Sequence, residues 1–212
     1  MNNKKNLVLF YGVIICILVG SFTTSKEVDA YSFPGRMTGG VGSYGNARKY
    51  YWATGTDGGT IGKIDTAVSK WVNSNGGATR TSLSFRRTTN RPSSKIDYIF
   101  ANYGNTGWFG RTDYYNGQAL VATPGQGPSR NYYWAEIKMN NYKFYNNASF
   151  SMIGGIGDVR ECIASHEFGH AIGLAHTPNK DAGSTRKVMR QDFPRVFSPA
   201  QAELQEVARM YP

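Results

Sequence analysis

Between residues 49 and 140, the spacing of apolar residues is that of a helix in one segment and that of strands in the others. Five of them recur every three or four positions, which predicts an amphipathic helix over 61–74: Ile61, Ile64, Val68, Trp71 and Val72. The run Asn75-Gly76-Gly77 is a typical helix end. Runs rich in β-branched and aromatic residues between turn signals predict five strands, at 49–54, 81–88, 95–103, 117–123 and 132–140.

The last third of the chain has the pattern of two helices with capped starts. Asp158 followed by Glu161 has the spacing of a capping box and predicts a helix that ends near Gly173. Ser198, with Pro199 at the first helical position, predicts a final helix to about Met210. With strands first and helices late, the order predicts one mixed α/β (α+β) domain over 49–212, with a twisted mixed sheet.

The N-terminus has the pattern of a secretory signal peptide. Lys4 and Lys5 precede an apolar run of 14 residues, 7–20, and Val28-Asp29-Ala30 is a small-residue cleavage site. A membrane anchor is the alternative, but a bilayer-spanning helix needs about 20 apolar residues. We therefore expect residues 1–30 to be removed and the protein to be secreted. Residues 31–48, rich in Gly and Ser, are expected to form a flexible leader or an extended arm.

Charge and cysteine content add a few constraints. The net charge of +10 becomes +9 when the signal peptide leaves with its three lysines and two acids. Between Asp65 and Asp97 there are six bases and no acid, which indicates either a solvated sheet edge or a surface that docks on an anionic polymer. No nucleic-acid partner is expected, and the chain is expected to be monomeric. Cys162 is the one cysteine outside the signal peptide, so no internal disulfide forms, and we expect it to be a small buried hydrophobe.

The sequence from His166 to His176, HEFGHAIGLAH, carries the candidate chemistry. His166 and His170 are four positions apart on the predicted helix, so both rings lie on one face, one turn apart. Gly173 allows a sharp turn, since glycine adopts positive φ at little cost, and the turn returns His176 as a third nitrogen. Three nitrogen ligands leave the fourth position of a zinc ion for water, which is typical of a catalytic zinc site. Glu167 lies next to this face, where it can act as general base.

This motif resembles the signature of the metzincin metalloproteases, H-E-x-x-H-x-x-G-x-x-H followed by a Met-turn. Met189, thirteen residues after His176, is the candidate Met of that turn. The chain is most similar to the matrixins, which are the catalytic domains of matrix metalloproteinases and their bacterial relatives. The resemblance implies a metzincin-type zincin fold with an active-site helix and a C-terminal helix. It also implies that an extended substrate pairs with an edge strand formed by Ala119, Leu120, Val121, Ala122 and Thr123.

The chain departs from the matrixin pattern at several positions. Thr177 stands where matrixins usually have Ser, and Arg190-Gln191 stands where their Met-turn continues with Tyr-Pro. Related branches have a Tyr ligand at the position of Gln191, which argues against those branches. The chain has three His in all, and the motif uses all three, so a second zinc site built from His is excluded.

Taken with the resemblance, these residues predict a zinc endopeptidase that binds one catalytic Zn²⁺ and cleaves protein or peptide substrates. Two other functions stay open: a zinc hydrolase that cuts cell-wall peptides, and a zinc-dependent binding protein without activity. A Ca²⁺ loop at 154–158 is a further hypothesis, as is a specificity pocket walled by 192–196.

Overall fold

The computed structural model describes residues 31–43, 49–54, 58–73, 79–146, 155–177, 187–192 and 196–212. The predicted signal peptide lies outside the described residues, so the division of the chain into 1–30, 31–48 and 49–212 stays a prediction. Within the described part, no helix is both long and apolar enough to cross a membrane.

A six-stranded sheet in the order β2-β1-β3-β6-β4-β5 forms the base of the molecule. Its strands are β1 (Lys49–Thr54), β2 (Phe85–Arg87), β3 (Ile96–Ala101), β4 (Gly110–Asn116), β5 (Ala119–Leu120) and β6 (Trp134–Asn140). The first four strands in this order run parallel, whereas β4 is antiparallel to both β6 and β5. The predicted mixed α/β fold with a mixed sheet is therefore confirmed.

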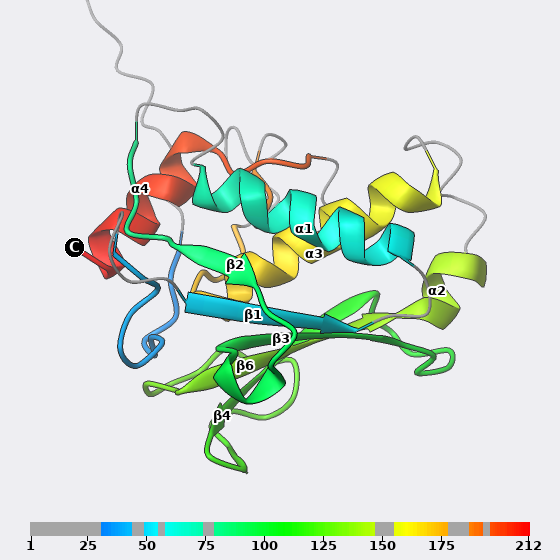
Figure 1. Ribbon diagram of the computed structural model, residues 1–212, viewed down its shortest axis with the longest axis horizontal. Helices are drawn as coiled ribbons and strands as arrows, with labels where there is room; N and C mark the ends of the chain where they lie inside the picture. Colours follow the sequence, from blue (N-terminus) through cyan, green and yellow to red (C-terminus); the bar gives the residue numbers. More distant parts are fainter. Residues whose placement is uncertain are drawn as a thin grey trace, which may run out of the picture.

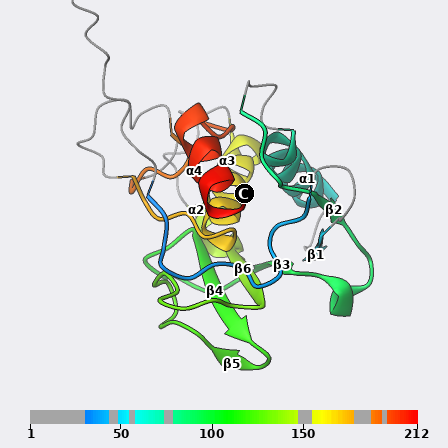
Figure 2. The same cartoon turned by 90° about the vertical axis from the view of Figure 1, so that its left-hand side faces the viewer.

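Four α-helices and one 3-10 turn complete the described structure: α1 (Gly58–Val72), α2 (Asn141–Asn146), α3 (Ile156–Ala171), α4 (Gln201–Met210) and η2 (Arg91–Ser93). Helices α1 and α3 lie side by side over one face of the sheet (Figure 1). Turned by 90°, the view shows that the β4–β5 end of the sheet lies far from α1 (Figure 2).

Helix α3 is the central element of the fold. Every residue from Val159 to Ala171 is buried, because α1, the sheet and the chain around Met189 all pack against it. The indole of Trp71 on α1, itself fully buried, donates a hydrogen bond to Ser165 of α3 at 2.9 Å. A helix covered in this way holds its side chains rigidly, which suits a functional site.

Some predicted bounds of strands and helices match the structure, and others differ by several residues. Strand β1 has the predicted bounds, and α1 begins three residues earlier than predicted. The strands predicted at 81–88 and 117–123 shrink to β2 and β5.

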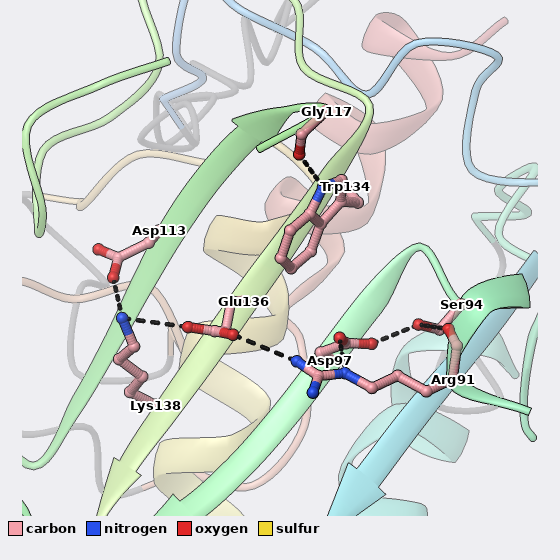
Figure 3. Close-up of polar contacts among 8 residues, drawn as sticks. All are labelled: Arg91, Ser94, Asp97, Asp113, Gly117, Trp134, Glu136 and Lys138. Atoms are coloured by element: carbon pink, nitrogen blue, oxygen red, sulfur yellow. Dashed lines mark hydrogen bonds and ion pairs between the residues drawn. The ribbon is translucent and has the colours of Figure 1, made fainter. Parts of the chain in front are cut away.

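Strand β4 was not predicted, because its sequence GRTDYYN contains two charged residues and looks like a loop. In the structure these charges form ion pairs with each other and with the neighbouring strand. Asp113 accepts hydrogen bonds from Arg111 on its own strand at 3.1 Å and from Lys138 on β6 at 2.7 Å. The chain of ion pairs then continues through Glu136 to Arg91 (Figure 3).

Both predicted helix caps are wrong. Helix α3 begins at Ile156, so Asp158 lies in its first turn, and Asp158 and Glu161 bind Lys63 of α1 at 3.2 and 3.1 Å. Glu161 also binds Lys70. The two acids therefore tie α3 to α1. Helix α4 begins at Gln201, two residues later than a cap at Ser198 requires.

Residues 31–43 of the predicted leader form an extended arm packed on the domain. Ser32 bridges to Leu174 and Met37 bridges to Tyr132. Met37 is 2% exposed and Val41 is fully buried, so the arm contributes to the core. Residues 44–48 lie outside the described part of the chain.

Candidate metal centre and active site

Three histidines come together where α3 ends. His166 and His170 lie one turn apart on α3, and Gly173 follows with φ of 103°, the left-handed conformation expected from the sequence. The amide of Gly173 donates to the carbonyl of His170 at 2.8 Å, which closes the turn. The chain then reverses and brings His176 back to the helix.

The Nε2 atoms of the three rings converge on one point. His166 and His170 are 3.1 Å apart at Nε2, His166 and His176 are 3.1 Å apart, and His170 and His176 are 3.0 Å apart. In the part of the chain that the structure describes, they are the one group of three or more His, Cys, Asp or Glu placed closely enough to hold a metal ion.

The opposite nitrogen of two rings is fixed by a backbone carbonyl. Nδ1 of His166 donates to Val188 O at 2.7 Å, and Nδ1 of His170 donates to Leu174 O at 2.8 Å. A carbonyl oxygen only accepts hydrogen bonds, so each Nδ1 carries the proton. Burial lowers the pKa of His166 to about 4 and that of His170 well below its usual value, with the neighbouring histidines as a second cause.

These two rings are therefore neutral, and each Nε2 presents a lone pair. Two lone pairs that face each other at 3.1 Å repel unless a cation lies between them. The donor set thus fits a metal ion, and three imidazole nitrogens, two of them held in this tautomer, suit zinc.

Met189 lies next to α3, in a turn with Val188. It is fully buried, and a Cβ added to Gly169 would lie 2.2 Å from its sulfur. The glycine between His166 and His170 therefore gives Met189 its space. The same turn supplies the Val188 carbonyl that holds His166, and the assignment of Met189 to a Met-turn stays a prediction.

Glu203 on α4 holds this turn in place, a role that sequence reasoning missed. Its fully buried carboxylate accepts hydrogen bonds from the amides of Met189 at 2.6 Å, Ala200 at 2.7 Å and Val188 at 3.3 Å. Burial raises the pKa of this carboxyl, while the three amides act in the opposite direction. The contact chain from Glu203 through Val188 to His166 links α4 to the metal site.

We expect Glu203→Gln to lower the free energy of unfolding by about 2–3 kcal/mol, because one buried amide then faces an NH₂ group instead of an acceptor. Glu206→Gln on the same helix is the matched control, since Glu206 pairs with exposed Arg209 and such pairs contribute about 0–1 kcal/mol. Urea denaturation of the two variants measures the difference. Equal stability of the two variants would remove Glu203 from this role.

Glu167 is buried beside the three rings and is held from β4. The hydroxyl of Thr112 donates to Glu167 Oε2 at 2.7 Å. A Cβ on Gly110 would lie 2.6 Å from both Cγ and Oε1 of Glu167. Burial raises the pKa of Glu167 to about 7, and the Thr112 hydrogen bond opposes this shift. Sequence reasoning missed both β4 residues because it missed their strand.

A cleft of about 810 Å³ opens over the three histidines and Glu167. The stretch 107–112 lines one side, 124–127 lines another, and Phe33 of the arm stacks against the His170 ring at 5.8 Å. Ala119–Thr123 do not line this cleft; β5 lies at the sheet edge, paired with Tyr115 and Asn116. The predicted pocket wall at 192–196 lies largely outside the described residues, apart from Asp192 and Val196.

Three further predictions from the sequence concern Cys162, the basic stretch 66–96 and a calcium site. Cys162 is fully buried, and burial raises its pKa to about 12, as expected for a packing residue. Three of the bases in the stretch 66–96 form ion pairs with described residues: Lys70 with Glu161, Arg87 with Asp65, and Arg91 with Asp97. These pairs favour the solvated-edge interpretation, and docking on an anionic polymer stays a prediction. A calcium site also stays a prediction, and Asp158, its one carboxylate, binds Lys63.

Comparisons with known proteins find likeness in structure but not in sequence. No protein-family model and no curated protein matches the chain. Solved structures of myroilysin are among those that resemble it. One is 14% identical with a TM-score of 0.45 and covers 78% of this chain and 80% of that chain. Another is 13% identical with a TM-score of 0.46 and covers 88% and 92%. The function proposed below therefore rests on the side chains of the site.

Proposed function

We propose that this protein is a secreted zinc-dependent endopeptidase of the metzincin type, similar to the matrixins. One observation carries the proposal: the Nε2 atoms of three histidines converge within 3.1 Å of one another, beside a buried glutamate at the floor of a cleft. His166, His170 and His176 would hold one zinc ion, and Met189 would be the Met of the Met-turn.

Zinc bound here would polarise the substrate carbonyl and lower the pKa of a water molecule to about 7. Glu167 accepts a proton from the attacking water and then donates it to the nitrogen of the leaving amine. The carbonyls of Val188 and Leu174 keep His166 and His170 in the tautomer that presents Nε2.

The substrate is proposed to bind as an extended strand at the β4 end of the sheet. The carbonyl of Tyr115 accepts from Tyr133 on the β6 side, and that of Tyr114 accepts from Val121 on the other side. Since this direction alternates along an antiparallel strand, the backbone groups of Gly110 and Thr112 also point away from β6. Both residues line the cleft, so we place main-chain pairing there instead of at Ala119–Thr123. Such pairing requires unfolded or flexible segments, which is the basis for endopeptidase action.

A digest separates the proposal from its alternatives. The zinc-loaded protein is incubated with casein and, in parallel, with purified bacterial cell wall, and released peptides are identified by mass spectrometry. The proposal expects internal cleavage of casein. Peptides released only from cell wall indicate the cell-wall hydrolase, and no hydrolysis of either substrate indicates the binding protein.

We also expect a hydroxamate to abolish hydrolysis, because it binds zinc in the position that substrate and water use. Serine-directed reagents should have no effect. An alkylating thiol reagent should also have none, because Cys162 is inaccessible and its thiol stays protonated. Residual activity after each treatment is the measurement, and loss of activity on alkylation would assign Cys162 a part in the reaction.

A further inference from the structure

Strand β4 contacts both sides of the Glu167 carboxylate. Thr112 is 4% exposed, and its hydroxyl lies 2.7 Å from Oε2 and 3.2 Å from the backbone oxygen of Glu167. A hydroxyl has one proton to donate, and the charged oxygen at the shorter distance is the stronger acceptor. The Thr112 hydroxyl therefore donates its hydrogen bond to the carboxylate of Glu167.

Gly110 lies on the other side of the same carboxylate, two residues earlier on the strand. A methyl group at this position would approach Oε1 and Cγ of Glu167 to 2.6 Å and Cγ2 of Ile163 to 2.7 Å. All of these distances are shorter than van der Waals contact, and Ile163 and Glu167 both lie on the buried face of α3. Position 110 therefore accepts only glycine if Glu167 keeps its present rotamer.

The alternation of β4 explains why these two residues act together. Residues two apart on a strand point to the same face, so positions 110 and 112 both face α3. The pairing of Gly110 with Met139 and of Thr112 with Ile137 fixes this register against β6. A shift of one residue would place Arg111 against Glu167, so the sheet itself determines how the glutamate is held.

We propose that Thr112 and Gly110 are positioning residues for the general base: the Thr112 hydroxyl anchors Oε2, and Gly110 leaves the space in which Oε1 reaches the water. Glutamate has three rotatable side-chain bonds, and a general base must lie within about 2.6–3.2 Å of the proton that it takes. With one oxygen anchored, the other is directed to the cleft at a fixed place. This inference rests on the proposed function, because it assigns Glu167 the role of base.

The test compares variants of the zinc-loaded protein on a fluorogenic peptide. Thr112→Val keeps the shape and removes the hydroxyl, and Thr112→Ser keeps the hydroxyl and removes the methyl group. We expect Thr112→Val to lower kcat about 10- to 100-fold, since a hydrogen bond to a charged group contributes about 1.5–3 kcal/mol. KM and zinc content should stay near the wild-type values, and Thr112→Ser should recover kcat to within about threefold of wild type. Gly110→Ala should also lower kcat at unchanged zinc content.

Thr81→Val is the matched control, because Thr81 is buried to the same degree, at 5% exposed, and does not line the cleft. It should leave kcat unchanged. If Thr112→Val does not fold, Thr112→Ser and Thr112→Ala form the deciding pair, since they differ only in the hydroxyl. The serine variant should then have at least tenfold higher kcat.

Two results would overturn the inference while the proposed function stands. The first is wild-type kcat in Thr112→Val, and the second is a serine variant as impaired as the valine or alanine variant. An inactive wild-type protein with zinc bound contradicts the proposed function instead, so the two failures are distinguishable.

Discussion

Replacing Glu167 by Gln is expected to lower peptide hydrolysis by about 10³-fold, because general-base catalysis contributes about 10²- to 10⁴-fold and the amide cannot take a proton. Gln has nearly the same shape as Glu and can still accept from the Thr112 hydroxyl through its oxygen. The three histidine rings are untouched, so zinc content should stay near one per chain. Hydrolysis of a fluorogenic peptide and metal analysis of the same sample measure both quantities.

The joint outcome of that experiment assigns the role. Retained activity at full zinc content would show that Glu167 is not the base. Loss of zinc along with activity would show that Glu167 acts on the metal site itself. Thr81→Val again serves as the control, because it alters a buried side chain away from the cleft.

His176→Ala is expected to abolish both zinc binding and hydrolysis. Structural zinc sites with four ligands bind with about 10–16 kcal/mol, so the loss of one ligand costs about 3 kcal/mol or more, at least about 100-fold in affinity. His176 is the most informative of the three, because it is the exposed one, and its replacement costs the core little. His166 and His170 are buried, and their variants could fail for reasons of stability.

Zinc affinity is measured by competition with a chromogenic chelator, with far-UV circular dichroism as the check on folding. A folded His176→Ala protein that binds zinc as tightly as wild type would show that His176 is not a ligand. In that case a centre made of two histidines alone would replace the three-histidine site.

The histidine motif could be placed from sequence because all of its geometry is local. Helix periodicity sets His166 and His170 on one face, and the positive φ of Gly173 returns His176 to them. No long-range information is needed for these steps. Strand β1 was also placed correctly, since its aromatic residues lie between clear turn signals.

The residues that hold the site's side chains in position could not be predicted, because they come from distant parts of the chain. Thr112 binds Glu167, which is 55 residues further along the chain. Its strand was not predicted because Arg111 and Asp113 interrupt the apolar pattern. Lys138, on the neighbouring strand, completes the charge balance that makes the strand stable. In the sequence alone, such charged residues indicate a loop. Their ion pairs form only when the strands lie side by side in the sheet.

The helix caps failed for a related reason. Asp158 and Glu161 have capping-box spacing, but their carboxylates bind Lys63, on a helix that packs against theirs. Glu203, in contrast, does bind a backbone amide at the start of its own helix. Its carboxylate accepts the amide of Ala200, as a glutamate three positions into a helix does, and reaches the Met189 turn as well. Local spacing alone did not distinguish these two uses of an acidic residue.

The central claim is that one zinc ion held by three histidines enables peptide hydrolysis. The most direct measurement is a zinc titration of metal-free protein, with the rate of internal cleavage of casein followed at each step. We predict no cleavage without metal, a rate that rises in proportion to added zinc, and a plateau at one zinc per chain. Full activity in the metal-free protein, or no activity at any zinc content, would contradict the account.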